Sequence, residues 1–108
     1  MVATVGVFGA VVAGYMADHV DAIGAVFGPR GVPVNSIKGA IGHTLGAAGA
    51  IESIAALAML KGGFVHPSIN CEDVHPEIEP FRDSIPHQLR ELPELRTIVK
   101  SGFGFGDV

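Results

Sequence analysis

An apolar run rich in glycine and alanine, residues 44–61, constrains this chain more than any other segment. It reads TLGAAGAIESIAALAMLK and is followed by Gly62-Gly63, a pair that ends helices because glycine readily adopts positive φ. Its large apolar residues fall on more than one face of a helix. Its small residues permit another backbone to approach closely. The pattern therefore predicts a core helix over residues 44–61 that is surrounded by protein.

The segments around this helix indicate strands. Residues 2–8 are apolar and β-branched without polar alternation, as in a strand buried on both faces. Residues 32–35 and 96–101 are two further expected strands, and residues 15–27 are an expected helix that ends at Gly28-Pro29. Residues 64–93 hold five prolines and predict a long surface excursion. We expect one α/β domain over residues 1–108, with a mostly parallel sheet packed on the buried helix.

Composition and charge exclude several classes of function. The net charge is −4 and the seven Lys and Arg residues are scattered, so the chain lacks the basic patch that binds nucleic acid. Cys71 is the single cysteine, which excludes an internal disulfide, and no Cys/His spacing is typical of a metal site. We therefore expect no metal and a cytoplasmic protein.

Neither apolar segment predicts a membrane protein. The apolar N-terminal residues lack the Lys or Arg of a signal peptide, and residues 45–60 are too short for a membrane span and contain Glu52. The stretch GVFGAVVAG does not give the G-x-G-x-x-G pattern of dinucleotide-binding domains. We expect no membrane span and no cofactor.

Lys38 and His43 stand five residues apart, directly before the predicted helix. The unpaired N–H groups at a helix start create positive potential, which favours a neutral imidazole that can donate one N–H to a developing oxyanion. Lys38 could then hold a carboxylate, and Glu52 is the candidate. The spacing is equally consistent with a structural role, in which His43 caps the helix, Lys38 is a solvated loop charge and Glu52 lies on an exposed helix face.

The sequence of this stretch resembles that of a known family. SIKGAIGHTLGAAGAIES is similar to the S-x-K-x-x-x-G-H-x-x-x-A-A-G-x-x-E segment of β-ketoacyl-acyl carrier protein synthases, condensing enzymes of the thiolase superfamily. The similarity continues through VHPSIN and SGFGFG and covers residues 28–106. The matching residues in the first segment are Ser36, Lys38, Gly42, His43, Ala47, Ala48, Gly49 and Glu52.

The resemblance implies the C-terminal half of a thiolase-like layered fold, incomplete at both ends relative to the family. It implies that His43 polarises the thioester carbonyl during decarboxylative condensation, and that Lys38 and Glu52 brace the catalytic site. It also assigns Phe103 and Phe105 to the acyl pocket, with Phe103 as its gate.

The chain departs from the family in two functional positions. The nucleophilic cysteine of the family lies in a preceding half that these residues do not include, and Cys71 does not match it. An ungapped alignment puts Phe8 where the family has its other catalytic histidine, which would remove a hydrogen-bond donor.

Two functions follow from the resemblance. The first is a fragment or diverged half of a β-ketoacyl synthase of fatty-acid or polyketide synthesis, inactive alone. Its expected partners are an acyl carrier protein or acyl thioester, and either a cysteine-bearing ketosynthase chain or a second copy of itself. The alternative is a non-catalytic, thiolase-like interaction subunit that dimerises or binds acyl chains or a carrier protein.

Overall fold

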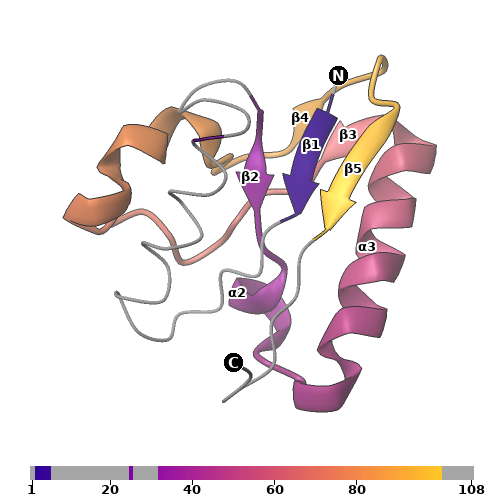
Figure 1. Cartoon of the computed structure of the whole chain (residues 1–108), viewed down its shortest axis with the longest axis horizontal. Helices are drawn as coiled ribbons and strands as arrows, with labels where there is room; N and C mark the ends of the chain where they lie inside the picture. Colours follow the sequence, from indigo (N-terminus) through magenta and orange to yellow (C-terminus); the bar gives the residue numbers. More distant parts are fainter. Residues whose placement is uncertain (1, 6–24, 26–31, 101–108) are drawn as a thin grey trace.

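The computed structural model describes residues 2–5, 25 and 32–100 (Figure 1). The expected helix over residues 15–27 lies outside the described residues except for Ala25, which is helical. Phe8, Phe103 and Phe105 also lie outside them, so their expected roles remain predictions. The elements, in chain order, are β1 (Val2–Val5), β2 (Val34–Asn35), α2 (Lys38–Ile41), the 3-10 turn η1 (Leu45–Ala47), α3 (Ala48–Gly62), β3 (Phe64–Val65), the 3-10 segment η2 (Pro76–Ser84), β4 (Arg90–Glu91) and β5 (Thr97–Lys100).

Three of the strands pair in parallel, in the order β2-β1-β5. Strand β1 lies in the middle, between β2 and β5, although β5 is far from it in the sequence. All three arrows point the same way in Figure 1. Strands β3 and β4 form a separate antiparallel pair. The expected single, mostly parallel sheet is therefore divided into three parallel strands and a short antiparallel ribbon.

Helix α3 runs alongside β5 and turns one face toward the protein (Figure 1). This face buries Glu52, Ala56 and Met59. Ala56 and Met59 form the main core with Val65 and Leu95. Burying a large apolar side chain such as that of Met59 or Leu95 contributes about 1.5–3 kcal/mol to the free energy of unfolding.

The expectation that protein surrounds this helix is wrong. Leu45, Ile54 and Leu57 are all more than half exposed, because the parallel strands can cover only one side of a helix. The expected helix end is confirmed, since Gly63 has φ 66° and its N–H donates to the carbonyl of Met59 at 2.8 Å. The start is later than expected, because residues 45–47 form a 3-10 turn before the α-helix begins.

The expected surface excursion contains a small core of its own. Val74, Ile78, Phe81 and Ile85 are buried against one another, and Cys71 packs on them. Two of these apolar residues, Ile78 and Phe81, lie three apart in η2, and Ile85 follows four residues later, just after η2 ends, so this spacing turns them to one side. The prolines therefore did not prevent local burial. Cys71 is partly buried and packs against this small core.

One helical segment among the described residues, Leu45–Gly62, is long and apolar enough to cross a membrane by length and composition alone. Core helices of soluble proteins pass the same test. Glu52 lies within this segment and forms buried ion pairs with lysines of other elements. The segment thus carries a paired charge near its middle, which is costly in a bilayer.

Candidate functional site

The carboxyl ends of the parallel strands and the start of α3 meet at one edge of the molecule. Because β2 and β5 both run parallel to β1, their carboxyl ends lie on the same side of the sheet. Strand β2 leads through Ser36 into α2, which lies beyond this edge together with the first turns of α3 (Figure 1). In open α/β sheets this is the edge at which ligands bind.

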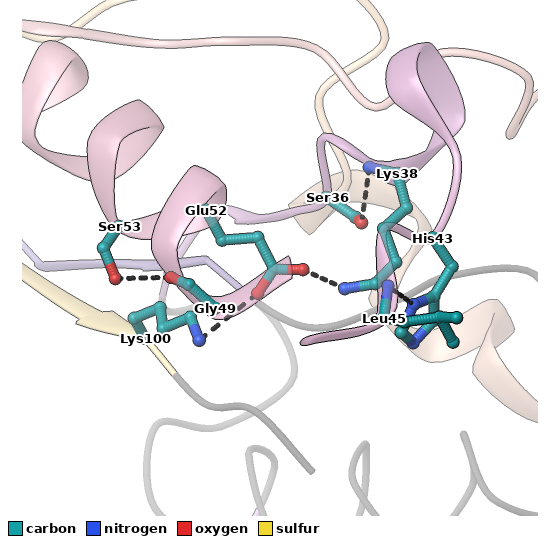
Figure 2. A network of polar contacts seen from close by, with 8 residues as sticks. All are labelled: Ser36, Lys38, His43, Leu45, Gly49, Glu52, Ser53 and Lys100. Carbon is teal, nitrogen blue, oxygen red and sulfur yellow. Dashed lines mark hydrogen bonds and ion pairs between the residues drawn. The ribbon is translucent and has the colours of Figure 1, made fainter. Parts of the chain in front are cut away.

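Three charged side chains from three elements gather there. The Lys38 ammonium of α2 donates to Oε1 of Glu52 in α3, and Nζ of Lys100 in β5 lies 3.3 Å from Oε2 of the same carboxylate (Figure 2). The side chains of Lys38 and Glu52 are each 4% exposed, and that of Lys100 is 24% exposed. The sequence prediction that Glu52 holds Lys38 is confirmed in geometry. The alternative interpretation of Lys38 as a solvated loop charge and Glu52 as an exposed helix residue is wrong.

The surroundings of Lys38 disfavour the charged form of its side chain. Burial lowers the pKa of this ammonium group, and the nearby positive charge of Lys100 lowers the pKa further. The ion pair with Glu52 offsets part of the cost of removing two charges from water. Lys38 is consequently a buried cation held in place by a single shared carboxylate.

His43 is oriented by the backbone that follows it. The Leu45 N–H donates to Nδ1 of His43 at 3.0 Å (Figure 2). Since Nδ1 is the acceptor, the neutral imidazole carries its proton on Nε2, which is then the donor nitrogen of the ring. Leu45 has φ 50°, the left-handed region that non-glycine residues rarely adopt. The strained turn thus points a backbone N–H at the ring at the start of the helical segment, a contact that the structural alternative, in which His43 caps the helix, also predicts.

Side chains that sequence reasoning left without a role brace α2. The Ser36 hydroxyl accepts from the Lys38 N–H at 3.2 Å, and the Ser36 N–H donates to Oγ of Ser68 at 3.0 Å. Nδ2 of Asn70 donates to the Gly39 carbonyl at 3.1 Å. Ser68 and Asn70 belong to the VHPSIN stretch, so that stretch packs on Ser36 and on α2, which begins at Lys38. The sequence pattern identified the stretch but gave no sign of this contact.

Lys100 is the charged residue of this site that the sequence analysis missed. Its only signal is a lysine at the end of an apolar strand, in TIVK. Within the described part of the chain, no group of three or more His, Cys, Asp or Glu residues could hold a metal ion. The cluster of two lysines and one glutamate is a cationic arrangement and offers no ligand set for a metal.

A comparison with known protein families identifies the family to which this sequence belongs. The β-ketoacyl synthase C-terminal domain matches residues 17–72, just over half of the chain. The chain belongs to this family. The resemblance of the Ser36 to Glu52 stretch to β-ketoacyl synthases is thereby confirmed, and the fold is that of a β-ketoacyl synthase C-terminal domain.

Several relatives of this β-ketoacyl synthase domain are fatty-acid or polyketide enzymes. The chain is 38% identical over 95 residues to the chloroplastic 3-oxoacyl-acyl-carrier-protein synthase I of Arabidopsis thaliana, covering 87% of this chain and 19% of that protein. It is 39% identical over 85 residues to 3-oxoacyl-acyl-carrier-protein synthase 1 of Escherichia coli K12, covering 79% and 20%. It is 42% identical over 74 residues to the putative polyketide beta-ketoacyl synthase 1 of Streptomyces halstedii, covering 68% and 17%.

A solved structure supports the same relationship. The chain superimposes with a TM-score of 0.75 and 34% identity on a chain of the AntDE:AntF complex, in which a type II polyketide synthase acyl-carrier protein is bound to its ketosynthase. The match covers 94% of this chain and 24% of that chain. The protein described here thus spans about a fifth of the length of the curated relatives it matches and corresponds to their C-terminal domain.

Proposed function

We propose that this chain supplies the histidine and lysine part of an acyl-condensation site in fatty-acid or polyketide synthesis. The observation that supports this proposal is the acceptor role of Nδ1 in His43, which leaves the proton of the neutral ring on Nε2. A neutral donor that follows Lys38 of a net positive cluster by five residues suits a reaction in which a thioester oxygen gains negative charge. Lys38 and Glu52 supply that cluster together with Lys100.

In the proposed reaction, the bond between the α-carbon and the carboxylate of a malonyl thioester breaks, carbon dioxide leaves, and the electron pair stays on the α-carbon. This carbon attacks the carbonyl of an acyl thioester, so that a new carbon–carbon bond forms while the acyl C–S bond breaks and the thiolate leaves and takes up a proton. Negative charge develops on the thioester oxygen, and the Nε2–H of His43 donates a hydrogen bond to it. Removing one such donor from an active site typically costs 10²–10³-fold in rate. Lys38 and Glu52 act here by holding this edge of the site in place, and with Lys100 they form a cluster of net positive charge.

The 108-residue chain by itself lacks a suitable nucleophile for holding the acyl group. Burial and the nearby charge of Glu72 raise the pKa of the Cys71 thiol, so little reactive thiolate forms at neutral pH. We therefore propose that a cysteine-bearing ketosynthase region or partner chain contributes the acyl-enzyme step, and that an acyl carrier protein or acyl thioester delivers the substrates. The isolated chain is then expected to be inactive.

The test is condensation of acyl and malonyl carrier protein substrates by the purified 108-residue chain, alone and mixed with a cysteine-bearing ketosynthase chain. Product is expected only in the mixture, and His43→Ala should abolish it. His87 is exposed, so His87→Ala is the matched control and should retain activity. Product formed by the isolated chain, or activity that survives His43→Ala in the mixture, would contradict the proposal.

A second candidate function is a non-catalytic interaction subunit that associates through α3. The exposed apolar residues Leu45, Ile54 and Leu57 favour it, because association removes exposed apolar side chains from water. Sedimentation of the purified chain at micromolar concentration distinguishes the two functions when combined with the assay above. A dimer that binds acyl carrier protein but never yields product, even in the mixture, would favour the interaction subunit, and a stable monomer would count against it.

A further inference from the structure

Two ammonium groups share one carboxylate at the edge of the sheet. The Lys38 ammonium donates to Oε1 of Glu52, and Nζ of Lys100 lies 3.3 Å from Oε2. The two lysines and one glutamate give a formal charge of +1 when all three are ionised, because two positive charges meet one negative charge. A carboxylate bound to a single lysine would instead give a neutral pair.

We propose that Lys100 is a positioning residue of the His43 site, which fixes the Glu52 carboxylate from its second oxygen and keeps a net positive charge beside Lys38. The usefulness of that charge rests on the proposed function, because it would attract the carboxylate of a malonyl group or a developing oxyanion. The positioning itself does not depend on any reaction.

The sheet fixes where Lys100 stands. Val5 of the central strand pairs with Asn35 on one side and with Lys100 on the other. Lys100 is therefore in the same row of the sheet as Asn35, which lies three residues before Lys38, the first residue of α2. The register of the parallel strands thus brings both lysines to one edge, and Glu52 joins them from α3.

The path of the Lys100 side chain indicates that Glu52 attracts it. Its ammonium lies 3.5 Å from the place that a Cβ of Gly49 would occupy, in the first turn of α3. A cation near the N-terminus of a helix is disfavoured by the helix dipole. The contact with Oε2 of Glu52 offsets this cost, and glycine at position 49 leaves room for the ammonium.

The electrostatic consequence falls on Lys38. The charged groups that contact Lys38 or share its partner are Glu52 of α3 and Lys100 of β5, and the next titratable group along the chain is His43, before η1. Burial lowers the pKa of Lys38, and the charge of Lys100 lowers it further. Removing the charge of Lys100 should therefore let Lys38 hold its proton more tightly.

The test is a pH titration of the lysine ammonium groups by ¹⁵N NMR on the full chain, with Lys38→Met used to assign the Lys38 signal. Lys100→Met removes the charge and keeps a side chain of similar length, whereas Lys100→Arg keeps the charge. Lys61 is exposed at the end of α3, so Lys61→Met is the matched control. Circular dichroism of each variant checks that it folds.

We expect Lys38 in the unmodified chain to titrate below an ordinary lysine. Its midpoint should move upward in Lys100→Met and stay in place in Lys100→Arg and Lys61→Met. An unmoved midpoint in Lys100→Met, or an equal movement in Lys61→Met, would overturn the proposal. So would a Lys38 that titrates at or above the ordinary lysine pKa in the unmodified chain, a result that needs no folded variant. None of these readouts requires catalysis, so failure of the condensation assay leaves them intact.

Discussion

The backbone N–H of Leu45 donates a 3.0 Å hydrogen bond to Nδ1 of His43, two residues earlier in the chain. This bond exists because Leu45 takes φ 50°, a conformation that costs a non-glycine residue roughly 1–2 kcal/mol. Strain of this kind persists only where the surrounding structure enforces it, and it often accompanies functional sites. Here the strained residue selects which ring nitrogen of His43 can donate.

The first prediction concerns the tautomer of His43. Because Nδ1 accepts a hydrogen bond, the neutral ring should carry its proton on Nε2. We expect ¹⁵N NMR of the neutral ring to show His43 almost entirely in the Nε2–H form. His87 lies exposed and serves as the comparison, with the tautomer mixture of a solvated histidine. A mixture at His43 equal to that at His87 would show that the Leu45 contact is not maintained in solution.

The strain at Leu45 gives a second prediction. Leu45 is mostly exposed, so replacing it loses little apolar burial, and asparagine tolerates the left-handed region better than leucine. Leu45→Asn should therefore increase the free energy of unfolding by about 1 kcal/mol, measured by urea denaturation. Leu57 is equally exposed but lies within α3, so Leu57→Asn should be neutral or slightly destabilising. A Leu45→Asn variant no more stable than Leu57→Asn would contradict this explanation.

A third prediction rests on the packing of α2 against the VHPSIN stretch. A Cβ at Gly39 would collide with the backbone oxygen of Ile69, whereas a Cβ at Gly46 would meet no described atom within 4 Å. Gly39→Ala should cost about 1–3 kcal/mol in the free energy of unfolding. Gly46→Ala should be neutral or stabilise by up to about 1 kcal/mol. Thermal denaturation of the two variants compares them directly, and equal effects would argue against the close contact.

Much of the site could be predicted from the sequence because its parts are local. The end of α3 follows from Gly62-Gly63, and the contact between Lys38 and Glu52 follows from a charge that interrupts an apolar helix. The place of His43 before the first turn of a helix follows from the same stretch of chain. In each case the residues that carry the sequence pattern lie within about twenty residues of the structural feature that they predict.

The remaining features depend on contacts between distant segments. Lys100 reaches Glu52 only because β5 pairs with β1 in a particular register, and register between parallel strands leaves no local mark in a sequence. The exposed side of α3 was mispredicted because an apolar pattern reports which residues can be buried, not whether a second layer covers them. The small core under η2 was missed because its prolines obscured the spacing of Ile78, Phe81 and Ile85.

Cys71 gives a prediction about pH. Burial raises the pKa of its thiol, with a further contribution from Glu72. The folded chain therefore holds the thiol proton more tightly than the unfolded chain does, so this group stabilises the fold below the ordinary cysteine pKa. That stability is lost as the pH rises through the higher pKa of the folded state. Alkylation of Cys71 by iodoacetamide should consequently reach half its maximal rate at a higher pH in the native chain than in urea. The same midpoint in both states would exclude the shift.

The last prediction compares two ion pairs of this chain that differ in burial. Glu52 is buried between Lys38 and Lys100, whereas the pair of Glu79 with Arg82 is exposed, with side chains 50% and 46% accessible. Removing one partner of a buried pair leaves an uncompensated charge and costs about 3–5 kcal/mol. An exposed pair contributes only about 0–1 kcal/mol.

Glu52→Gln should accordingly lower the free energy of unfolding by about 3 kcal/mol or more, and Glu79→Gln by less than about 1 kcal/mol. Urea denaturation at neutral pH measures both changes, and both substitutions remove one negative charge without changing side-chain size. The loss in Glu52→Gln should shrink at alkaline pH, because Lys38, whose pKa is already lowered by burial, then releases its proton and no longer leaves a buried charge without a partner. Equal losses for the two variants, or a Glu52→Gln loss that does not depend on pH, would show that the buried cluster does not form as described.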